Sequence, residues 1–158
     1  MERVIEGAER DAGAGKHEAG KHEAGKHGAG TRETAPERRV IEGVVEHGQR
    51  LGRELGFPTA NLAVPAGFPL SDGVYRSRAE VGERWYDSMS NLGCNPTVGG
   101  GKRRLETHIF GFAGELYGSR LRVELLEKIR DERRFSTLEE LQAQIAEDRA
   151  TVLHLLGK

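Results

Sequence analysis

The chain has 158 residues and a mass of 17.4 kDa, which corresponds to one domain with some excess. Its formal net charge is −1, and the part after residue 38 carries 17 basic and 17 acidic residues, so no net field attracts a polyanion; this argues against a dedicated nucleic-acid-binding protein. No apolar run approaches the ~18 residues of a membrane span and the single cysteine excludes an intrachain disulfide, so we expect a cytoplasmic protein without a membrane partner.

Residues 1–38 have the composition of a disordered tail. An Ala-Gly-Lys-His-Glu unit recurs with decay over residues 13–30, and no large apolar residue occurs between Ile5 and Val40. A segment with nothing to bury cannot offset the entropy lost on ordering it. The repeated histidines could bind Zn²⁺ or Ni²⁺ weakly, but a solvated low-complexity tail is the better interpretation. We therefore expect one folded domain, residues 39–158.

From Val40 onwards the pattern changes to short β-like runs. In residues 74–81 every second side chain is small or apolar and the others are mostly charged, which is the alternation of a half-buried strand. About six such strands, with glycine-rich connections and no helices between them, predict a mainly β fold. The expected architecture is a small, closed, six-stranded antiparallel barrel with Greek-key-like connections. Further strands are indicated at residues 85–89, at His108, Phe110 and Phe112, and at Leu121, Val123 and Leu125.

The period of the pattern changes again near the C-terminus. Ser136-Thr137-Leu138-Glu139 matches a capping box, which is a start signal for a helix. Gly157 can end that helix. We expect one C-terminal α-helix whose apolar stripe contains Leu138, Leu141, Ile145, Val152 and Leu156.

The decapeptide at residues 52–61, Gly-Arg-Glu-Leu-Gly-Phe-Pro-Thr-Ala-Asn, carries the strongest chemical signal. Thr59 and Asn61 offer a hydroxyl and an amide oxygen on one side of an extended chain. Hard oxygens beside a loop rich in glycine and arginine suit Mg²⁺ carrying the phosphates of a nucleotide, because Mg²⁺ takes few protein ligands. A turn stabilised by the Thr and Asn side chains is the plain structural alternative. The loop is not a P-loop, because no Gly-x-x-x-x-Gly-Lys-Ser/Thr string occurs.

The same segment could form a cradle for phosphates. Its glycines let the backbone approach a ligand closely, Arg53 brings a permanent cation and Pro58 stiffens the turn. An ordinary flexible loop is the alternative. The residues that we predict to bind the phosphates of ATP are Gly48, Gly52, Arg53, Gly56, Pro58 and Thr59.

Glu106 is the candidate catalytic residue. It is in phase with His108 and Phe110, so we expect it to share their apolar, inward-pointing face. Desolvation on such a face raises the pKa of a carboxyl group, and a carboxylate of that kind can take a proton from an alcohol. The alternative is a glutamate at the mouth of the barrel that pairs with Arg103 or Arg104.

The other reactive side chains have structural interpretations. Cys94 has no legible His/Asp arrangement around it and is expected to be a small apolar filler. His47 and His108 are lone histidines on β segments. The basic run Lys102-Arg103-Arg104 is expected to be a solvated hairpin tip.

Residues 52–61 closely resemble the Gly-Arg-x-Leu-Gly-[Phe/Tyr]-Pro-Thr-Ala-Asn signature of riboflavin kinases. The resemblance implies a barrel with a C-terminal helix, a catalytic role for Glu106, and magnesium binding by Thr59 and Asn61. Further matches follow in the order of the family from about Val40 to about Val152: Gly73-Val74-Tyr75, Asn91 to Thr97, Leu105 to Ile109, Phe112 to Gly118, and Ile129 to Phe135.

The resemblance also implies a flavin-binding segment at Arg130 and Phe135. In the family this region helps to close over the flavin, and an aromatic or guanidinium plane can stack on the isoalloxazine ring. Phe135 as a core residue beneath the helix is the alternative.

The implied activity is the ATP-dependent phosphorylation of the ribityl 5′-hydroxyl of riboflavin to give FMN, with Mg²⁺ as the metal. The alternatives are a non-catalytic flavin- or nucleotide-binding module of the same fold, and an oligonucleotide-binding barrel, which the neutral charge disfavours. The chain resembles the C-terminal kinase domain of bacterial bifunctional enzymes, in which an adenylyltransferase domain converts FMN to FAD. The 38 residues before the domain are too few for that second fold, so we expect a kinase alone, acting as a monomer.

Overall fold

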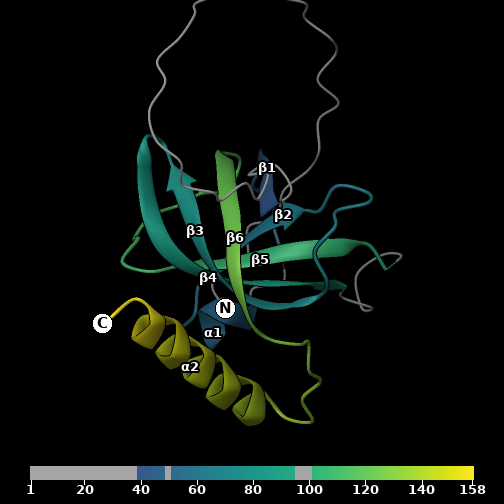
Figure 1. Cartoon of the computed structure of the whole chain (residues 1–158), viewed down its shortest axis with the longest axis vertical. Coiled ribbons are helices and arrows are strands. Elements are labelled where there is room, and N and C mark those ends of the chain that lie inside the picture. The colour runs from purple at the N-terminus through teal and green to yellow at the C-terminus, as the bar shows by residue number, and fades with distance from the viewer. Residues whose placement is uncertain (1–38, 49–50, 95–100) are drawn as a thin grey trace, which may run out of the picture.

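The computed structural model describes residues 39–48, 51–94 and 101–158 (Figure 1). The predicted tail, residues 1–38, lies outside the described residues. Within the described part, no helix is long and apolar enough to cross a membrane. The elements in chain order are β1 (Val40–Val44), α1 (Leu51–Glu54), β2 (Ala60–Ala63), β3 (Gly73–Val81), β4 (Arg84–Cys94), β5 (Arg103–Ile109), β6 (Arg120–Arg130) and α2 (Leu138–Leu155).

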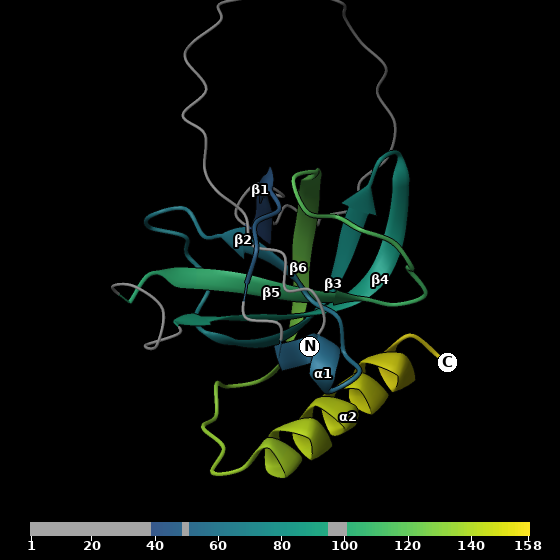
Figure 2. The same cartoon turned by 180° about the vertical axis from the view of Figure 1, so that it is seen from behind.

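The strands form one antiparallel sheet in the order β1-β6-β3-β4-β5-β2. Its two ends meet at one bridge beyond β1, where the Glu46 N–H donates to the Asn61 carbonyl at 3.4 Å. The sheet therefore curls into a nearly closed barrel, and α2 lies across one end of it (Figures 1 and 2). The predicted mainly β fold, a six-stranded barrel followed by one helix, is confirmed.

The barrel interior is filled by every second residue of its strands. On β3, Tyr75, Ser77 and Ala79 are buried, whereas Arg76 and Arg78 lie closer to solvent, as the alternation predicted. Each large aliphatic side chain that leaves water in this way stabilises the fold by about 1.5–3 kcal/mol before the entropy cost of folding. The largest fully buried aliphatic side chains are Ile41, Leu62, Leu92, Leu105, Leu121 and Leu125.

β5 turns the opposite set of residues to the interior from the one that we predicted. Leu105 and Thr107 are fully buried inside the barrel, whereas Glu106 and His108 lie on the outer face of the strand. The outer face is partly apolar as well, because α2 covers it. Alternation alone could therefore not distinguish the inner face from the outer one.

The two phenylalanines after β5 do not continue its phase. The strand ends at Ile109, and Gly111 turns the chain with a φ of +69°. Phe110 consequently packs beneath α2, and Phe112 packs against the barrel interior. The expected alternation through Phe112 was therefore wrong.

α2 packs on the outer face of the sheet through a second apolar cluster. Its centre is made by Val74 on β3, Met89 on β4 and Val152 on the helix. Leu138 does not join the predicted stripe, because half of its surface is exposed (50%). The partly buried members of the cluster are Phe110, Ile129, Ile145 and Leu156.

Both ends of α2 are capped by side-chain or backbone bonds. The N-cap is Thr137, whose hydroxyl accepts from the backbone N–H of Glu140, so the predicted capping box is shifted by one residue. The Glu140 carboxylate in turn accepts from the backbone N–H of Ser136 at 3.0 Å. At the other end Gly157 has a φ of +70°, and the Lys158 N–H donates to the Leu153 carbonyl at 2.9 Å, which completes a Schellman cap.

A short helix, α1, occupies part of the segment that we predicted to be a loop. The Phe57 N–H donates to the Gly52 carbonyl at 2.7 Å and so closes the turn after it. Gly56 adopts a φ of +82°, a conformation that favours glycine and ends the helix. The glycines of the decapeptide thus shape a turn between α1 and β2.

Candidate active site

The strand register aligns the predicted metal and catalytic residues in one row across the sheet. Asn61 pairs with Glu106, Glu106 with Asn91, Asn91 with Val74, and Val74 with Arg130. Directly paired residues of an antiparallel sheet point to the same face and have Cα atoms about 4.5–5.5 Å apart. Glu106 and Asn61 are therefore direct neighbours on the outer face, and Arg130 lies on the same face three strands beyond Glu106.

One cavity, of about 230 Å³, lies between this face and α2. We call it the helix cavity. It brings Glu106 together with Arg130 and Phe135, the two predicted flavin contacts, although these residues are far apart in sequence. The side chains that line it include the apolar Phe57, Val74, Met89, Leu141 and Ile145 and the polar Thr59, Asn91, His108, Glu132, Arg133 and Asp148.

A second cavity, of about 450 Å³, opens beside the decapeptide, and we call it the mouth cavity. Three of the predicted phosphate-binding residues, Arg53, Pro58 and Thr59, line it. Gly52 and Gly56 belong to the same turn but do not line it, and Gly48 precedes two residues outside the described part. The remaining lining residues are Ala60, Thr107, Ile109, Phe112, Ala113, Gly114 and Leu116.

Thr59 lies where the two cavities meet, and it is the one residue that lines both. Its Oγ1 is buried and has no hydrogen-bond partner in the described part of the chain. A buried hydroxyl without a partner costs free energy, so such a group in a cavity wall is a candidate contact for a ligand or an ion.

The donor set around Thr59 fits a magnesium ion that is shared with phosphates. Asn61, two residues further on, is almost fully buried (2% exposed) and adds an amide oxygen. The described residues contain no group of three or more His, Cys, Asp or Glu side chains able to hold a metal by themselves. Mg²⁺ typically takes one or two protein oxygens and completes its shell with phosphate and water.

His108, which we expected to be structural, lines the helix cavity and makes a hydrogen bond within the protein. Its Nδ1 lies 2.7 Å from the Pro58 carbonyl oxygen. Because a carbonyl can only accept, Nδ1 carries the hydrogen, and the bond ties β5 to the residue before Thr59. Burial lowers the pKa of His108 and the nearby Arg149 lowers it as well, which outweighs the opposite effect of the bond to the Pro58 carbonyl. The sequence contained a signal for this location, because His108 is two residues after Glu106 and therefore shares its face of the strand.

Arg130 is held in a bidentate ion pair that sequence reasoning missed. Its Nε and Nη2 each donate to Asp148 on α2 at 2.8 Å, and Asp148 is buried (3% exposed). The guanidinium carbon lies 5.8 Å from the centre of the Phe135 ring. Asp148 stands at the i+3 position from Ile145 and four residues before Val152, so a carboxylate within the apolar stripe was the available signal.

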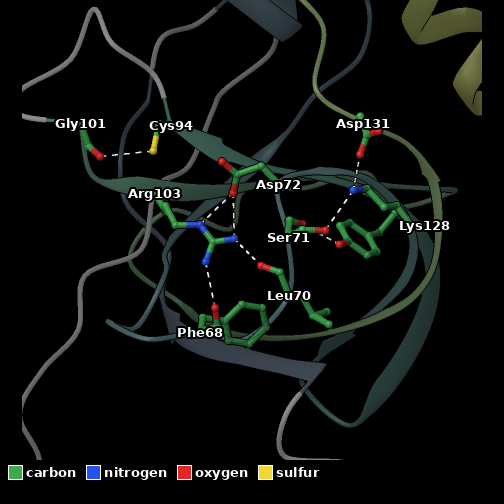
Figure 3. Close-up of polar contacts among 10 residues, drawn as sticks. Phe68, Leu70, Ser71, Asp72, Cys94, Gly101, Arg103, Lys128 and Asp131 are labelled. Carbon is green, nitrogen blue, oxygen red and sulfur yellow. Dashed lines mark hydrogen bonds and ion pairs between the residues drawn. The ribbon is translucent and has the colours of Figure 1, made fainter.

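The prediction of a solvated hairpin tip at residues 102–104 is wrong for Arg103 and Arg104. The Arg103 guanidinium donates to Asp72 at 2.8 Å and to the carbonyls of Phe68 and Leu70 (Figure 3). Arg104 donates to Glu46 at 3.1 Å. These part-buried bonds fasten neighbouring segments to the start of β5, because an arginine can use its fork of donors on several oxygens at once.

Cys94 differs from the expected apolar filler, and His47 gains a stacking partner. Cys94 is exposed, and its thiol donates to the Gly101 carbonyl at 3.2 Å (Figure 3), so the prediction of an apolar filler was wrong. His47 is exposed and stacks on Tyr117 with ring centres 3.5 Å apart.

Comparison with known proteins decides which family has this arrangement. The family model described as riboflavin kinase, or flavokinase, matches residues 35–156. The chain belongs to the riboflavin kinase family. Its family relationship confirms the resemblance that the decapeptide and the later motifs indicated.

Two curated relatives show how much of a riboflavin kinase family protein the chain spans. It is 42% identical over 118 residues to a bifunctional riboflavin kinase/FMN adenylyltransferase of Escherichia coli K12, which covers 74% of the chain and 38% of the relative. It is also 42% identical over 110 residues to the RNA-binding riboflavin kinase RibR of Bacillus subtilis, covering 69% of the chain and 47% of that protein. The chain therefore spans less than half of either relative.

A solved structure shares the fold. The crystal structure of a protein titled macrolide-efflux protein from Streptococcus pneumoniae matches with a TM-score of 0.61 and 33% sequence identity. The match covers 72% of the chain and 38% of that protein. Most of this fold therefore also occurs within a larger solved chain.

Proposed function

We propose that this chain transfers the γ-phosphoryl group of ATP to the 5′-hydroxyl of riboflavin, giving FMN and ADP. The observation that carries the proposal is Thr59, whose unpartnered buried hydroxyl stands where the two cavities meet. A phosphotransferase needs two substrate sites that touch at the transferred group. The family relationship supports the choice of riboflavin and ATP as the substrates.

In this proposal Glu106 receives the proton of the attacking hydroxyl. A bond forms between the ribityl 5′-oxygen and the γ-phosphorus, while the bond from the γ-phosphorus to the β,γ-bridging oxygen breaks. The proton passes to the Glu106 carboxylate and the leaving oxygen becomes part of ADP. Because phosphoryl transfer has a loose transition state, holding the hydroxyl in line contributes as much as removing its proton.

The mouth cavity would take the nucleotide, since Arg53 supplies a cation and the 52–58 turn lies beside it. Thr59 and Asn61 would hold Mg²⁺, which neutralises charge on the phosphates when bound. We include the predicted phosphate residues Gly48, Gly52, Gly56 and Pro58 in this proposal. Of these, Pro58 lines the cavity.

The helix cavity would take the flavin, because it combines an apolar wall with an aromatic ring at its rim. Phe135 is half-buried there, and Arg130 is fixed by Asp148 in front of it. A fixed guanidinium and a phenyl ring offer planes on which a flat heterocycle can stack.

We further propose that the chain acts as a monomer in the cytoplasm, where ATP and Mg²⁺ are present, and without a nucleic-acid partner. One relative carries RNA-binding in its name, but on the outer face of β6 the exposed arginines have acidic partners. Arg122 lies 3.5 Å from Glu80, and Arg120 lies 2.7 Å from Glu42. Paired cations offer little net field to a polyanion.

The test is to incubate the purified chain with riboflavin, MgATP and buffer, and to identify the flavin product by chromatography. Formation of FMN with one ADP per riboflavin, dependent on the metal, is the expected result. Binding of both ligands without turnover would favour the alternative, a non-catalytic module of the same fold. Absence of riboflavin binding would refute both.

A further inference from the structure

The connection from β6 to α2 places the Glu132 carboxylate directly against the backbone of β4. A Cβ atom added to Gly93 would overlap the carboxylate of Glu132, so the Glu132 side chain would have to move away to make room for it. Gly93 is absent from the glycines with positive φ, so its backbone does not require glycine. The Glu132 carboxylate occupies the space that a side chain at position 93 would take, so glycine at this position lets the carboxylate stay where it is.

Glu132 differs from the other charged side chains that line the helix cavity. Arg130 is engaged by Asp148, Arg133 donates to a glutamine of α2 at 2.9 Å, and Glu106 has a partner of its own. Glu132 makes no hydrogen bond or ion pair within the part of the chain that the structure describes. It therefore presents two acceptor oxygens to the cavity with no donor assigned to them.

The arginines near Glu132 offset its charge only in part. Arg130, Arg103 and Arg134 act to lower its pKa. The donors of Arg103, however, are taken by Asp72 and by two loop carbonyls (Figure 3). Partial burial raises the pKa of Glu132, and the charge of Asp72 raises it further. A partly desolvated acceptor gains from a donor that a ligand brings, and hydrogen bonds to a charged acceptor are the stronger kind.

Glu132 rests on β4 close to the neighbour of Glu106 on that strand. Asn91 pairs with Glu106, and Gly93 is two residues further along β4, which corresponds to about 7 Å. A substrate that offers one hydroxyl to Glu106 therefore carries its more distant donors towards Glu132. Riboflavin has two kinds of such donor, the remaining ribityl hydroxyls and the imide N–H of the ring.

We propose that Glu132 is a specificity-determining residue that accepts a hydrogen bond from an O–H or N–H donor of riboflavin, and that Gly93 keeps its site open. The inference rests on the proposed function. It assigns the discrimination between flavins to a carboxylate outside the catalytic row.

The first test measures riboflavin affinity by quenching of flavin fluorescence in the full chain. Glu132→Gln should raise the Kd about tenfold and leave the Kd of MgATP unchanged. The matched control is Asp131→Asn, which makes the same charge change one residue away. Asp131 pairs with Lys128 on the outside of the cavity (Figure 3), so its variant should bind riboflavin like the wild type. Equal Kd values for Glu132→Gln and wild type, or equal shifts in both variants, would overturn the proposal.

The second test is a double-mutant cycle between positions 93 and 132. Gly93→Ala should displace the carboxylate and raise the riboflavin Kd in the wild-type background, but should add little in a Glu132→Ala background. Additive effects would show that the two residues act independently and would refute the contact as the cause. The cycle does not depend on turnover, so it stays informative for a chain that binds but does not phosphorylate.

Analogues identify the donor. If the imide N–H is the partner, 3-methylriboflavin should bind equally to wild type and Glu132→Gln; if a ribityl hydroxyl is the partner, a deoxyribityl analogue should do so. Discrimination that persists with every analogue would overturn the proposal. Failure of the wild-type chain to bind riboflavin at all would refute the proposed function and, with it, this inference.

Discussion

At the scale of single residues, the site depends on which side chains are engaged by the protein and which are left for a ligand. Arg130 and His108 line the helix cavity but have protein partners, Asp148 and the Pro58 carbonyl. Thr59 has a buried oxygen without one. Because unpaired buried oxygens are costly, this residue is the best guide to where a ligand belongs.

Glu106→Gln tests the catalytic carboxylate. The amide keeps the shape and can still contact the substrate hydroxyl, but it cannot take its proton, so kcat should fall by roughly 10²–10⁴. Riboflavin and MgATP should bind as before, since neither cavity loses volume. Steady-state kinetics check this, and a variant that keeps more than about a third of the wild-type kcat would show that Glu106 is not the catalytic group.

Thr59→Val tests the metal site. The valine has nearly the same shape and removes an oxygen that has no partner in the protein, so the melting temperature should not fall. The Mg²⁺ concentration for half-maximal rate should rise, as it should for Asn61→Ala. Metal titration at fixed ATP gives the answer, and an unchanged metal dependence in both variants would remove these oxygens from the ion.

The lowered pKa of His108 predicts a pH dependence of stability. Below the ordinary value of 6.5, the unfolded chain takes up a proton that the folded chain resists. Stability should therefore be complete above about pH 6.5 and fall as the pH drops towards the lowered pKa. The charged group that acts on His108 from a neighbouring element is Arg149 on α2. The partly buried Glu132, with its raised pKa, contributes in the opposite direction.

His108→Asn isolates this contribution, because asparagine can keep a donor for the Pro58 carbonyl but does not titrate. Melting temperatures of both proteins between pH 7.5 and 5.5 should show a shallower decline for the variant. Parallel curves would mean that His108 does not cause the decline.

At the scale of elements, α2 is attached to the barrel by an apolar cluster and by one buried ion pair. The pair joins the end of β6 to the middle of the helix, and it fixes the wall of the helix cavity. The packing of α2 depends on this pair, because Asp148 lies within the apolar stripe of the helix and a buried charge without a partner is strongly unfavourable.

Asp148→Asn should therefore lower the free energy of unfolding by about 3 kcal/mol, because it leaves Arg130 without its counter-charge in a part-buried site. Denaturant unfolding measures this. The matched control is Glu147→Gln, an exposed neighbour on the same helix, which should change stability by less than about 0.5 kcal/mol. Similar losses in both variants would refute a special role of the pair.

At the scale of the whole molecule, the curled sheet brings residues from distant parts of the chain to one place. Glu106 of β5, Thr59 before β2 and Phe135 before α2 line a single cavity. The barrel supplies the rigid row of paired strands, and the connections between elements supply the rims of both cavities.

Removal of residues 1–37 should leave the melting temperature and kcat/KM nearly unchanged. The reason lies in the sequence, because no large apolar residue occurs between Ile5 and Val40 and a segment without one buries little. Thermal denaturation and steady-state kinetics of the shortened and full chains make the comparison. A loss of several degrees would show that the segment packs on the barrel.

The sequence by itself determined the family, the six strands, the C-terminal helix and the residues of the decapeptide. These follow from local order: alternation marks strands, capping residues mark helix ends, and a contiguous motif needs no knowledge of distant contacts. The same local rules failed for β5, where both faces are partly apolar, and for the one-residue shift of the helix cap.

Only the tertiary structure decided which groups meet. Three features of the site depend on contacts between residues up to about 90 positions apart. Thr59 lines both cavities, Asp148 holds Arg130, and Glu132 rests on Gly93. Sequence spacing carries no information on such pairs, because strand register and helix docking are set by the packing of the whole barrel. The sequence therefore indicated the candidate residues, whereas the fold determined how they are arranged.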